Sequence, residues 1–114
     1  MKNLRIEAEK LLNAATATGA GSKFALSGAK HSFQAIGNTS SGVGASVIRI
    51  EVSSKELPTA DSDWLLAGTI TLTLGTTATS DGFVIDASWK WVRGNISSIS
   101  GTGATVTLWK GMPS

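Results

Sequence analysis

The chain of 114 residues contains no cysteine, no tyrosine and a single histidine. The absence of cysteine excludes disulfide bonds, Cys-ligated zinc and thiol catalysis, and it is compatible with folding in a reducing cytoplasm. Only 16% of the residues are charged, the formal net charge is +2, and the basic residues are scattered singly. Because nucleic-acid binding depends on a concentrated basic surface, we expect no nucleic-acid partner.

Long apolar segments are also missing. No stretch approaches the roughly 18 apolar residues that are needed to cross a bilayer, so we expect no membrane partner. The N-terminal sequence MKNLRIEAEKLLNAATATG does not resemble a signal peptide, because Glu7, Glu9 and Lys10 interrupt its apolar residues. We therefore expect the protein to be made and folded in the cytoplasm of the cell that produces it.

Glycine, serine and threonine are abundant, with 13, 15 and 13 residues. Threonine and valine favour strands, whereas glycine and serine favour turns. Short runs with alternating apolar residues recur at a regular spacing, and they predict strands over residues 13–18, 22–26, 31–37, 46–53, 69–74, 83–87, 90–98 and 104–109. This pattern predicts one all-β domain over residues 13–114, an antiparallel β-sandwich of the jelly-roll or immunoglobulin type.

The N-terminal residues 1–12 fit more than one structure. Leu4, Ile6 and Ala8 alternate as in a strand. In a helix, one face would instead carry Leu4, Ala8, Leu11 and Leu12. We assign this segment to an extended N-terminal arm that reaches a neighbouring subunit, with Leu4 and Ile6 at the contact. A frayed terminus or an edge strand is the alternative.

The last two predicted strands carry large aromatic residues on an unexpected side. Their core-facing residues alternate with a set that contains Trp91, Arg93 and Trp109. The sequence SGTG between the strands predicts a hairpin, so these three side chains would share its outer face. Because exposed Trp and Arg are enriched in protein interfaces, we predict a subunit interface here, with Trp64 as a further member. A purely structural aromatic pair, or a β-bulge that returns one Trp to the core, is the alternative.

The sequence offers no convincing catalytic or cofactor-binding motif. The only histidine, His31, lies at the start of a predicted strand without a nucleophile motif. Asp61 and Asp63 have the spacing of the first ligands of a calcium loop, but the later glycine and glutamate of that loop are missing, so we expect a solvated loop and no metal. We expect a protein that is not an enzyme; a small β enzyme that uses Glu51 or Asp86 in a cleft is the alternative.

Seven short motifs follow one another over most of the chain. They are ATATGAG (15–21), SFQAIG (32–37), VIRIEVSS (47–54), W-x3-GTITLTL (64–74), TSDGF (79–83), W-x-W-V-R (89–93) and ISSISGTGATVTLW (96–109). Their order resembles that of small virion structural proteins of tailed bacteriophages. The resemblance implies a β-sandwich module without catalytic residues, of the kind found as capsid decoration (cement) proteins or as tail and fibre accessories, many of them trimeric.

We therefore expect a bacteriophage capsid decoration protein, a homotrimer on the outer surface of the virion that bridges subunits of the major capsid protein. The N-terminal arm and the tryptophan face would make the contacts. The alternative with the same fold is a tail, baseplate or fibre accessory module, which could also bind carbohydrate, since exposed tryptophans can hold sugars.

Overall fold

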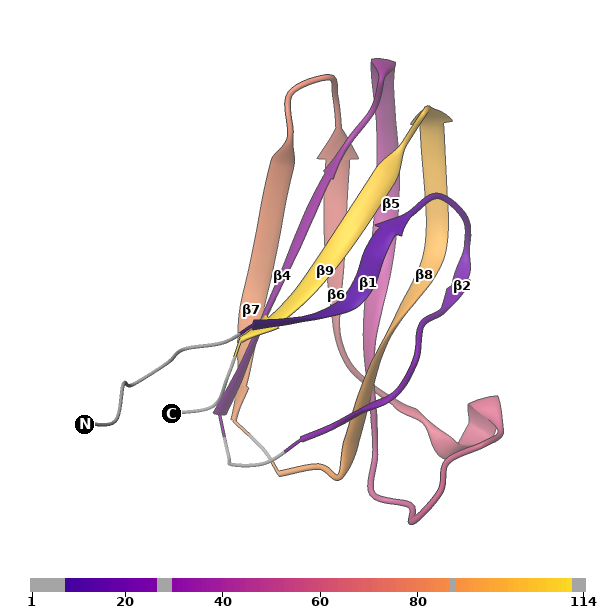
Figure 1. The fold of residues 1–114 in the computed structure, drawn as a ribbon, viewed down its shortest axis with the longest axis vertical. Coiled ribbons are helices and arrows are strands. Elements are labelled where there is room, and N and C mark those ends of the chain that lie inside the picture. Colours follow the sequence, from indigo (N-terminus) through magenta and orange to yellow (C-terminus); the bar gives the residue numbers. More distant parts are fainter. Residues whose placement is uncertain (1–7, 27–29, 87, 112–114) are drawn as a thin grey trace, which may run out of the picture.

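The computed structural model describes residues 8–26, 30–86 and 88–111. Within these residues two antiparallel sheets pack face to face (Figure 1), which confirms the predicted all-β sandwich. The strands are β1 (Ala8–Ala15), β2 (Gly19–Ala20), β3 (Phe24–Ala25), β4 (Lys30–Asn38), β5 (Ser41–Ser53), β6 (Leu65–Leu74), β7 (Thr79–Asp86), β8 (Trp91–Thr102) and β9 (Thr105–Gly111).

The strand order is that of a jelly roll. Sheet A has the order β1-β9-β4-β7, and sheet B has the order β2-β8-β5-β6, with β3 also paired with β8. If β2 and β3 are counted as one interrupted strand, the chain changes sheet at every step among these strands except between β5 and β6. In an immunoglobulin sandwich several consecutive pairs of strands stay in one sheet. The alternating order is therefore the double-sheet jelly roll, and this selects between the two sandwich types that the sequence left open.

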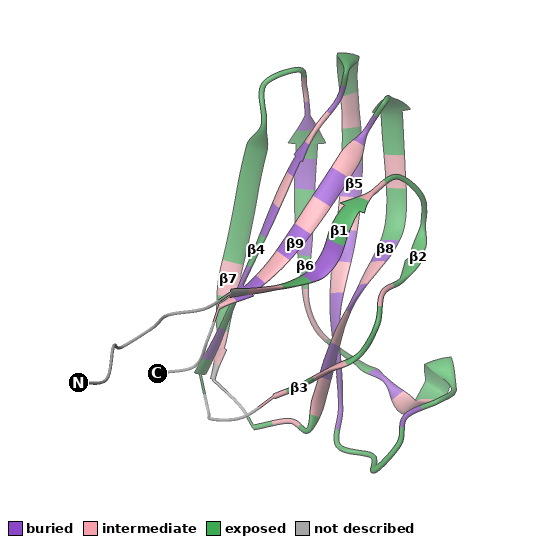
Figure 2. Ribbon diagram, in the orientation of Figure 1, coloured by how far each residue is buried: buried purple, intermediate pink, exposed green. Residues whose placement is uncertain are grey.

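The core lies between the two sheets and is built from alternate residues of the long strands. Figure 2 shows the alternation of buried and half-buried residues along β9. This is the period of two that a strand with one dry face requires. The buried apolar side chains that pack together in this core are those of Leu11, Leu12, Phe33, Ala35, Ile48, Ile50, Val52, Ile70, Leu72, Leu74, Val92, Ile96, Ala104, Val106 and Leu108.

The last two strands do not form the predicted hairpin. β8 belongs to sheet B and β9 to sheet A, so the SGTG turn carries the chain from one sheet to the other. Gly101 and Gly103 do have positive φ angles of 117° and 64°, which glycine adopts at little cost. Strands that face each other across the core bury the same alternate positions as neighbours in one sheet. The periodicity therefore identified the buried residues of both strands correctly but could not identify their pairing.

Part of the predicted N-terminal arm belongs to the sandwich. β1 begins at Ala8 and pairs with β9, so the boundary predicted after residue 12 falls inside a strand. Leu11 and Leu12 are both buried, and the register with β9 is irregular at this point. Such a bulge lets two consecutive residues face the core. Leu4 and Ile6, the predicted contact residues of the arm, lie outside the described residues.

Candidate functional site

The predicted interface residues lie on opposite sides of the sandwich. Trp91 and Arg93 project from β8 on the outer face of sheet B, whereas Trp109 projects from β9 on the outer face of sheet A. The prediction that these three residues share one face is therefore wrong, because it depended on the hairpin. Trp64 does lie beside Arg93, as part of the connection between β5 and β6. The role of any of them in a subunit interface stays a prediction.

Arg93 joins sheet B to the segment of residues 54–64, which we call the β5–β6 loop. The centre of its guanidinium lies 4.6 Å from the centroid of the buried Trp64 ring. Its Nε lies 2.7 Å from Oε1 of Glu51 on β5, and its Nη2 lies 3.2 Å from Oδ1 of Asp61 in the loop. The guanidinium thus holds the loop against the sheet through a cation–π contact with Trp64 and an ion pair with Asp61, and its second ion pair, with Glu51, joins β8 to β5 within the sheet.

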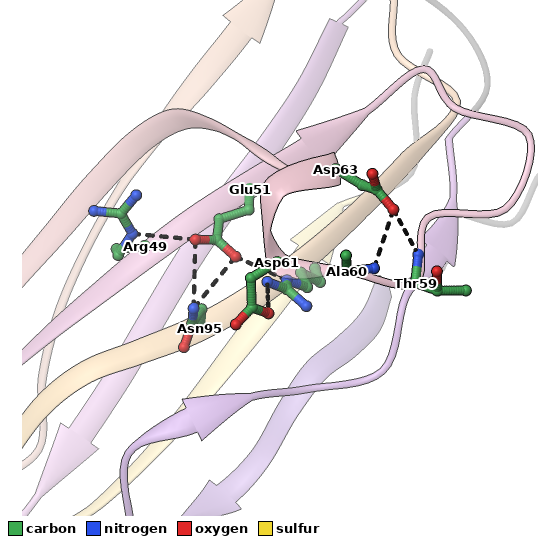
Figure 3. Close-up of polar contacts among 8 residues, drawn as sticks. Arg49, Glu51, Thr59, Ala60, Asp61, Asp63 and Asn95 are labelled. Carbon is green, nitrogen blue, oxygen red and sulfur yellow. Dashed lines mark hydrogen bonds and ion pairs between the residues drawn. The ribbon is translucent and has the colours of Figure 1, made fainter.

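Glu51 is the centre of this polar cluster. It lies on the outer face of sheet B, yet only 6% of it is exposed. Figure 3 shows its carboxylate between Arg49 and Asn95. It accepts hydrogen bonds from Arg49 Nε at 3.1 Å, from Arg93 Nε at 2.7 Å and from Asn95 Nδ2 at 3.3 Å. A buried carboxylate is tolerated only when its oxygens are paired, and here donors from two neighbouring strands pair them. The carboxylate is fully engaged, so the cluster fits a structural role better than an acid–base role.

Asp63 fixes the β5–β6 loop from within. Its carboxylate accepts hydrogen bonds from the backbone amides of Thr59 at 2.9 Å and Ala60 at 3.0 Å (Figure 3), and from Lys55 Nζ at 2.9 Å. The bond from Lys55, with the two amide bonds, lowers the pKa of Asp63 from 3.8 to about 2. Trp91 adds a bond between sheet and loop, because its Nε1 donates to the Glu56 carbonyl at 3.2 Å.

The residues considered for a metal site or for catalysis do not converge. Asp61 turns to Arg93, whereas Asp63 turns to the loop backbone, as described above. Among the residues that the structure describes, no group of three or more His, Cys, Asp or Glu could hold a metal ion. His31 is buried on the inner face of sheet A. Glu51 lies on β5 in sheet B and Asp86 ends β7 in sheet A, so the two residues named for a small β enzyme belong to different sheets.

Trp109 has different surroundings on the outer face of sheet A. Lys10 of β1 lies on one side of it, with its Nζ 5.0 Å from the centroid of the indole. On the side of β4 lies a hollow of about 280 Å³, which we call the Trp109 hollow. It is lined by Ser32, Gln34, Ile36, Trp109 and Gly111.

A second concave surface lies where β6 and β7 form the edges of their sheets. This apolar cleft of about 370 Å³ is lined by Val52, Leu65, Leu66, Ala67, Ile85 and Trp89. Leu65 and Leu66 are 56% and 49% exposed. Trp89, two residues before Trp91, packs against the core.

Sequence reasoning missed the apolar cleft because it began the β6 strand at residue 69, whereas β6 begins at Leu65. The sequence WLLAG at residues 64–68 is apolar but does not alternate, so its periodicity gave no strand signal. Adjacent exposed leucines beside a turn were the available indication of a surface site.

Comparison with known proteins gives no relative from which a function could be inferred. No family model, no curated protein and no solved structure matches the chain. Within the described residues, none of the helical structure is long and apolar enough to span a membrane.

Proposed function

We propose that this protein is a virion structural protein of the capsid decoration type, which acts by binding protein surfaces and not by catalysis. The observation that carries the proposal is the apolar cleft between β6 and β7, with the exposed side chains of Leu65 and Leu66 beside it. Contiguous exposed apolar residues around a concave surface are typical of protein-binding sites. The order of the sequence motifs and the jelly-roll arrangement, which is frequent in viral capsid domains, support the same proposal.

Binding through the cleft would stabilise a capsid by adding buried apolar area across the joints between its subunits. Each square ångström of apolar surface removed from water contributes about 25 cal/mol. A ligand that binds only the folded, assembled state also stabilises that state by mass action. Cross-bridging of this kind requires no reactive group.

The proposal includes a homotrimer at a local threefold position of the head. A trimer at this position presents three apolar clefts to the surrounding capsid subunits. The three contacts act together, so the avidity of the trimer exceeds the affinity of a single cleft. The N-terminal arm, with Leu4 and Ile6, would reach the neighbouring subunit. The partner at the apolar cleft is then the major capsid protein.

The test is binding of the purified protein to expanded empty heads, followed by sedimentation and calorimetry. We expect cosedimentation and a higher melting temperature of the heads. Leu66→Asp should abolish binding, because it places a charge at the cleft. Val43→Asp is the matched control: Val43 is 82% exposed and does not line the cleft, so this variant should bind like the parent protein.

Location separates this function from that of a tail, baseplate or fibre module. Immunogold labelling of virions should show hundreds of copies over the head. A few copies at one vertex, together with failure to bind empty heads, would show that the protein is a tail component instead.

A further inference from the structure

We propose that the Trp109 hollow binds a pyranose unit of a neutral polysaccharide that lies across the outer face of sheet A. The apolar cleft lies at the edge formed by β6 and β7, away from β9, so this site is separate from the one that carries the proposed function. Both sites can therefore be occupied at once, and each can be tested alone.

The position of the hollow follows from the register of sheet A. Trp109 pairs with Lys10 of β1 on one side and with Gln34 of β4 on the other. Ser32 and Ile36 flank Gln34 at the alternate positions of β4, so these side chains share the outer face with the indole. The hollow thus lies beside the indole on the side away from Lys10.

The lining combines the two kinds of group that a sugar ring needs. A pyranose has C–H groups on its faces and hydroxyl groups around its edge. The indole of Trp109 and the side chain of Ile36 offer apolar contact, and the Ser32 hydroxyl and the Gln34 amide can each donate and accept hydrogen bonds. A largely apolar, aromatic lining with a few polar groups is the usual composition of small-molecule sites. None of the lining residues carries a charge, which favours a neutral sugar over an acidic one.

The size of the hollow favours one ring of a longer chain. Its volume of about 280 Å³ lies just below the range of about 300–1,000 Å³ that encloses drug-sized ligands. Beyond it the same face continues with the small polar side chains of Asn38, Thr105 and Thr107 on β4 and β9. A polar surface next to one aromatic platform suits a chain that extends past the platform.

Gly111 keeps one end of the hollow open. A Cβ atom at this position would collide with Oγ of Ser32. The φ angle of Gly111 is not positive, so this glycine provides space and not a special backbone conformation. A larger side chain at position 111 would project from β9 and fill the hollow. Valine is a suitable choice for the test, because a β-branched residue is compatible with a strand.

The test uses the full chain and three probes: maltohexaose, cellohexaose and N-acetylchitohexaose, at millimolar concentration. The chain has four tryptophans, so their indole N–H resonances can be followed individually in a ¹⁵N spectrum. We expect at least one probe to shift the Trp109 resonance and to leave those of Trp64 and Trp91 in place. Trp109→Ala and Gly111→Val should each weaken that binding by about tenfold or more.

Trp91→Ala is the matched control, because Trp91 is also half-buried on an outer face but belongs to sheet B. It should bind the same probe with unchanged affinity. The proposal is wrong if none of the three probes shifts the Trp109 resonance, or if binding persists in Trp109→Ala. It is also wrong if the Trp109 resonance depends on protein concentration and Trp109→Ala dissociates an oligomer, since the face is then a contact between copies. None of these results affects the binding of empty heads through the apolar cleft.

Discussion

On the outer face of sheet B, Trp64 of the β5–β6 loop packs against Arg93, and Trp91 donates a hydrogen bond to the same loop. On the outer face of sheet A, Trp109 contacts a lysine and borders an open hollow. The sequence predicted that all three tryptophans contribute to a subunit interface. The difference comes from the loop, which contributes Asp61, the Glu56 carbonyl and Trp64 itself to the surface of sheet B. An outward tryptophan therefore has a structural role where a loop folds back over the sheet. Where no loop covers the sheet, the tryptophan remains available to bind a ligand or a partner.

The largest expected effect comes from removing the indole that the loop places on sheet B. Trp64→Ala should lower the free energy of unfolding by about 3–4 kcal/mol, because it removes a buried aromatic side chain and the surface that Arg93 covers. Trp109→Ala should cost less than about 1 kcal/mol, since surface substitutions away from special features are usually mild. Guanidinium denaturation of both variants measures the difference. Equal losses would contradict the contrast between the two faces.

Glu51→Ala should rank second, with a loss of about 2–3 kcal/mol, because it leaves the guanidinium of Arg93 without its closest partner in a largely buried position. Glu51→Gln is the control, since it keeps the shape and one acceptor oxygen and should lose less. Urea unfolding of the two variants, with and without Arg93→Ala, gives the coupling between the side chains. A coupling energy near zero would mean that the ion pair does not contribute to the stability of sheet B.

Trp91→Phe removes the hydrogen bond between β8 and the Glu56 carbonyl. Phenylalanine keeps one six-membered aromatic ring but lacks the pyrrole half of the indole and its Nε1 donor, so we expect a loss of at least about 0.5–1 kcal/mol, the value of the hydrogen bond alone. Amide hydrogen exchange should quicken in residues 54–57 and stay unchanged in β9. Unchanged exchange in the loop would show that this bond does not restrain it.

The smallest expected effect is the loosening of the β5–β6 loop by acid. The pKa of Asp63 is lowered from 3.8 to about 2, so its contribution is complete above pH 4 and is lost as the pH falls through about 2. Asp63→Asn lacks the charge at every pH, so the difference in melting temperature between it and the parent protein should shrink over that interval. A difference that stays constant down to pH 2 would assign the loop's order to other contacts.

The alternation of side chains made the buried faces predictable, and it did so for strands in both sheets. The residues that alternate with Trp91, Arg93 and Trp109 were predicted to face the core, and those on β8 and β9, among them Val92, Ile96, Val106 and Leu108, are buried. Their pairing was not predictable, because two strands that face each other across a core, typically about 10 Å thick, have the same pattern as two strands joined by a hairpin. The error about Trp91 and Trp109 follows from that single ambiguity.

The polar cluster and the apolar cleft were beyond a reading of the sequence for another reason. Glu51 was recognisable as an outward residue of its strand, but its burial depends on a loop whose path no local signal specifies. Asp61 and Asp63 looked alike, yet one faces a guanidinium and the other faces backbone amides. Contacts between segments distant in the chain are decided by the folded geometry, and residue spacing carries little of that information.

The position of β9 has a consequence for how the molecule is made. This strand is synthesised after β1 and β4, yet it lies between them and supplies the only partner that β1 has within the described residues. On the ribosome, β4 and β7 can pair as soon as both have emerged, whereas β1, which carries Leu11 and Leu12, has no strand to pair with until β9 has emerged. Nascent chains of this protein are therefore exposed to chaperones and proteases until residues 105–111 are released.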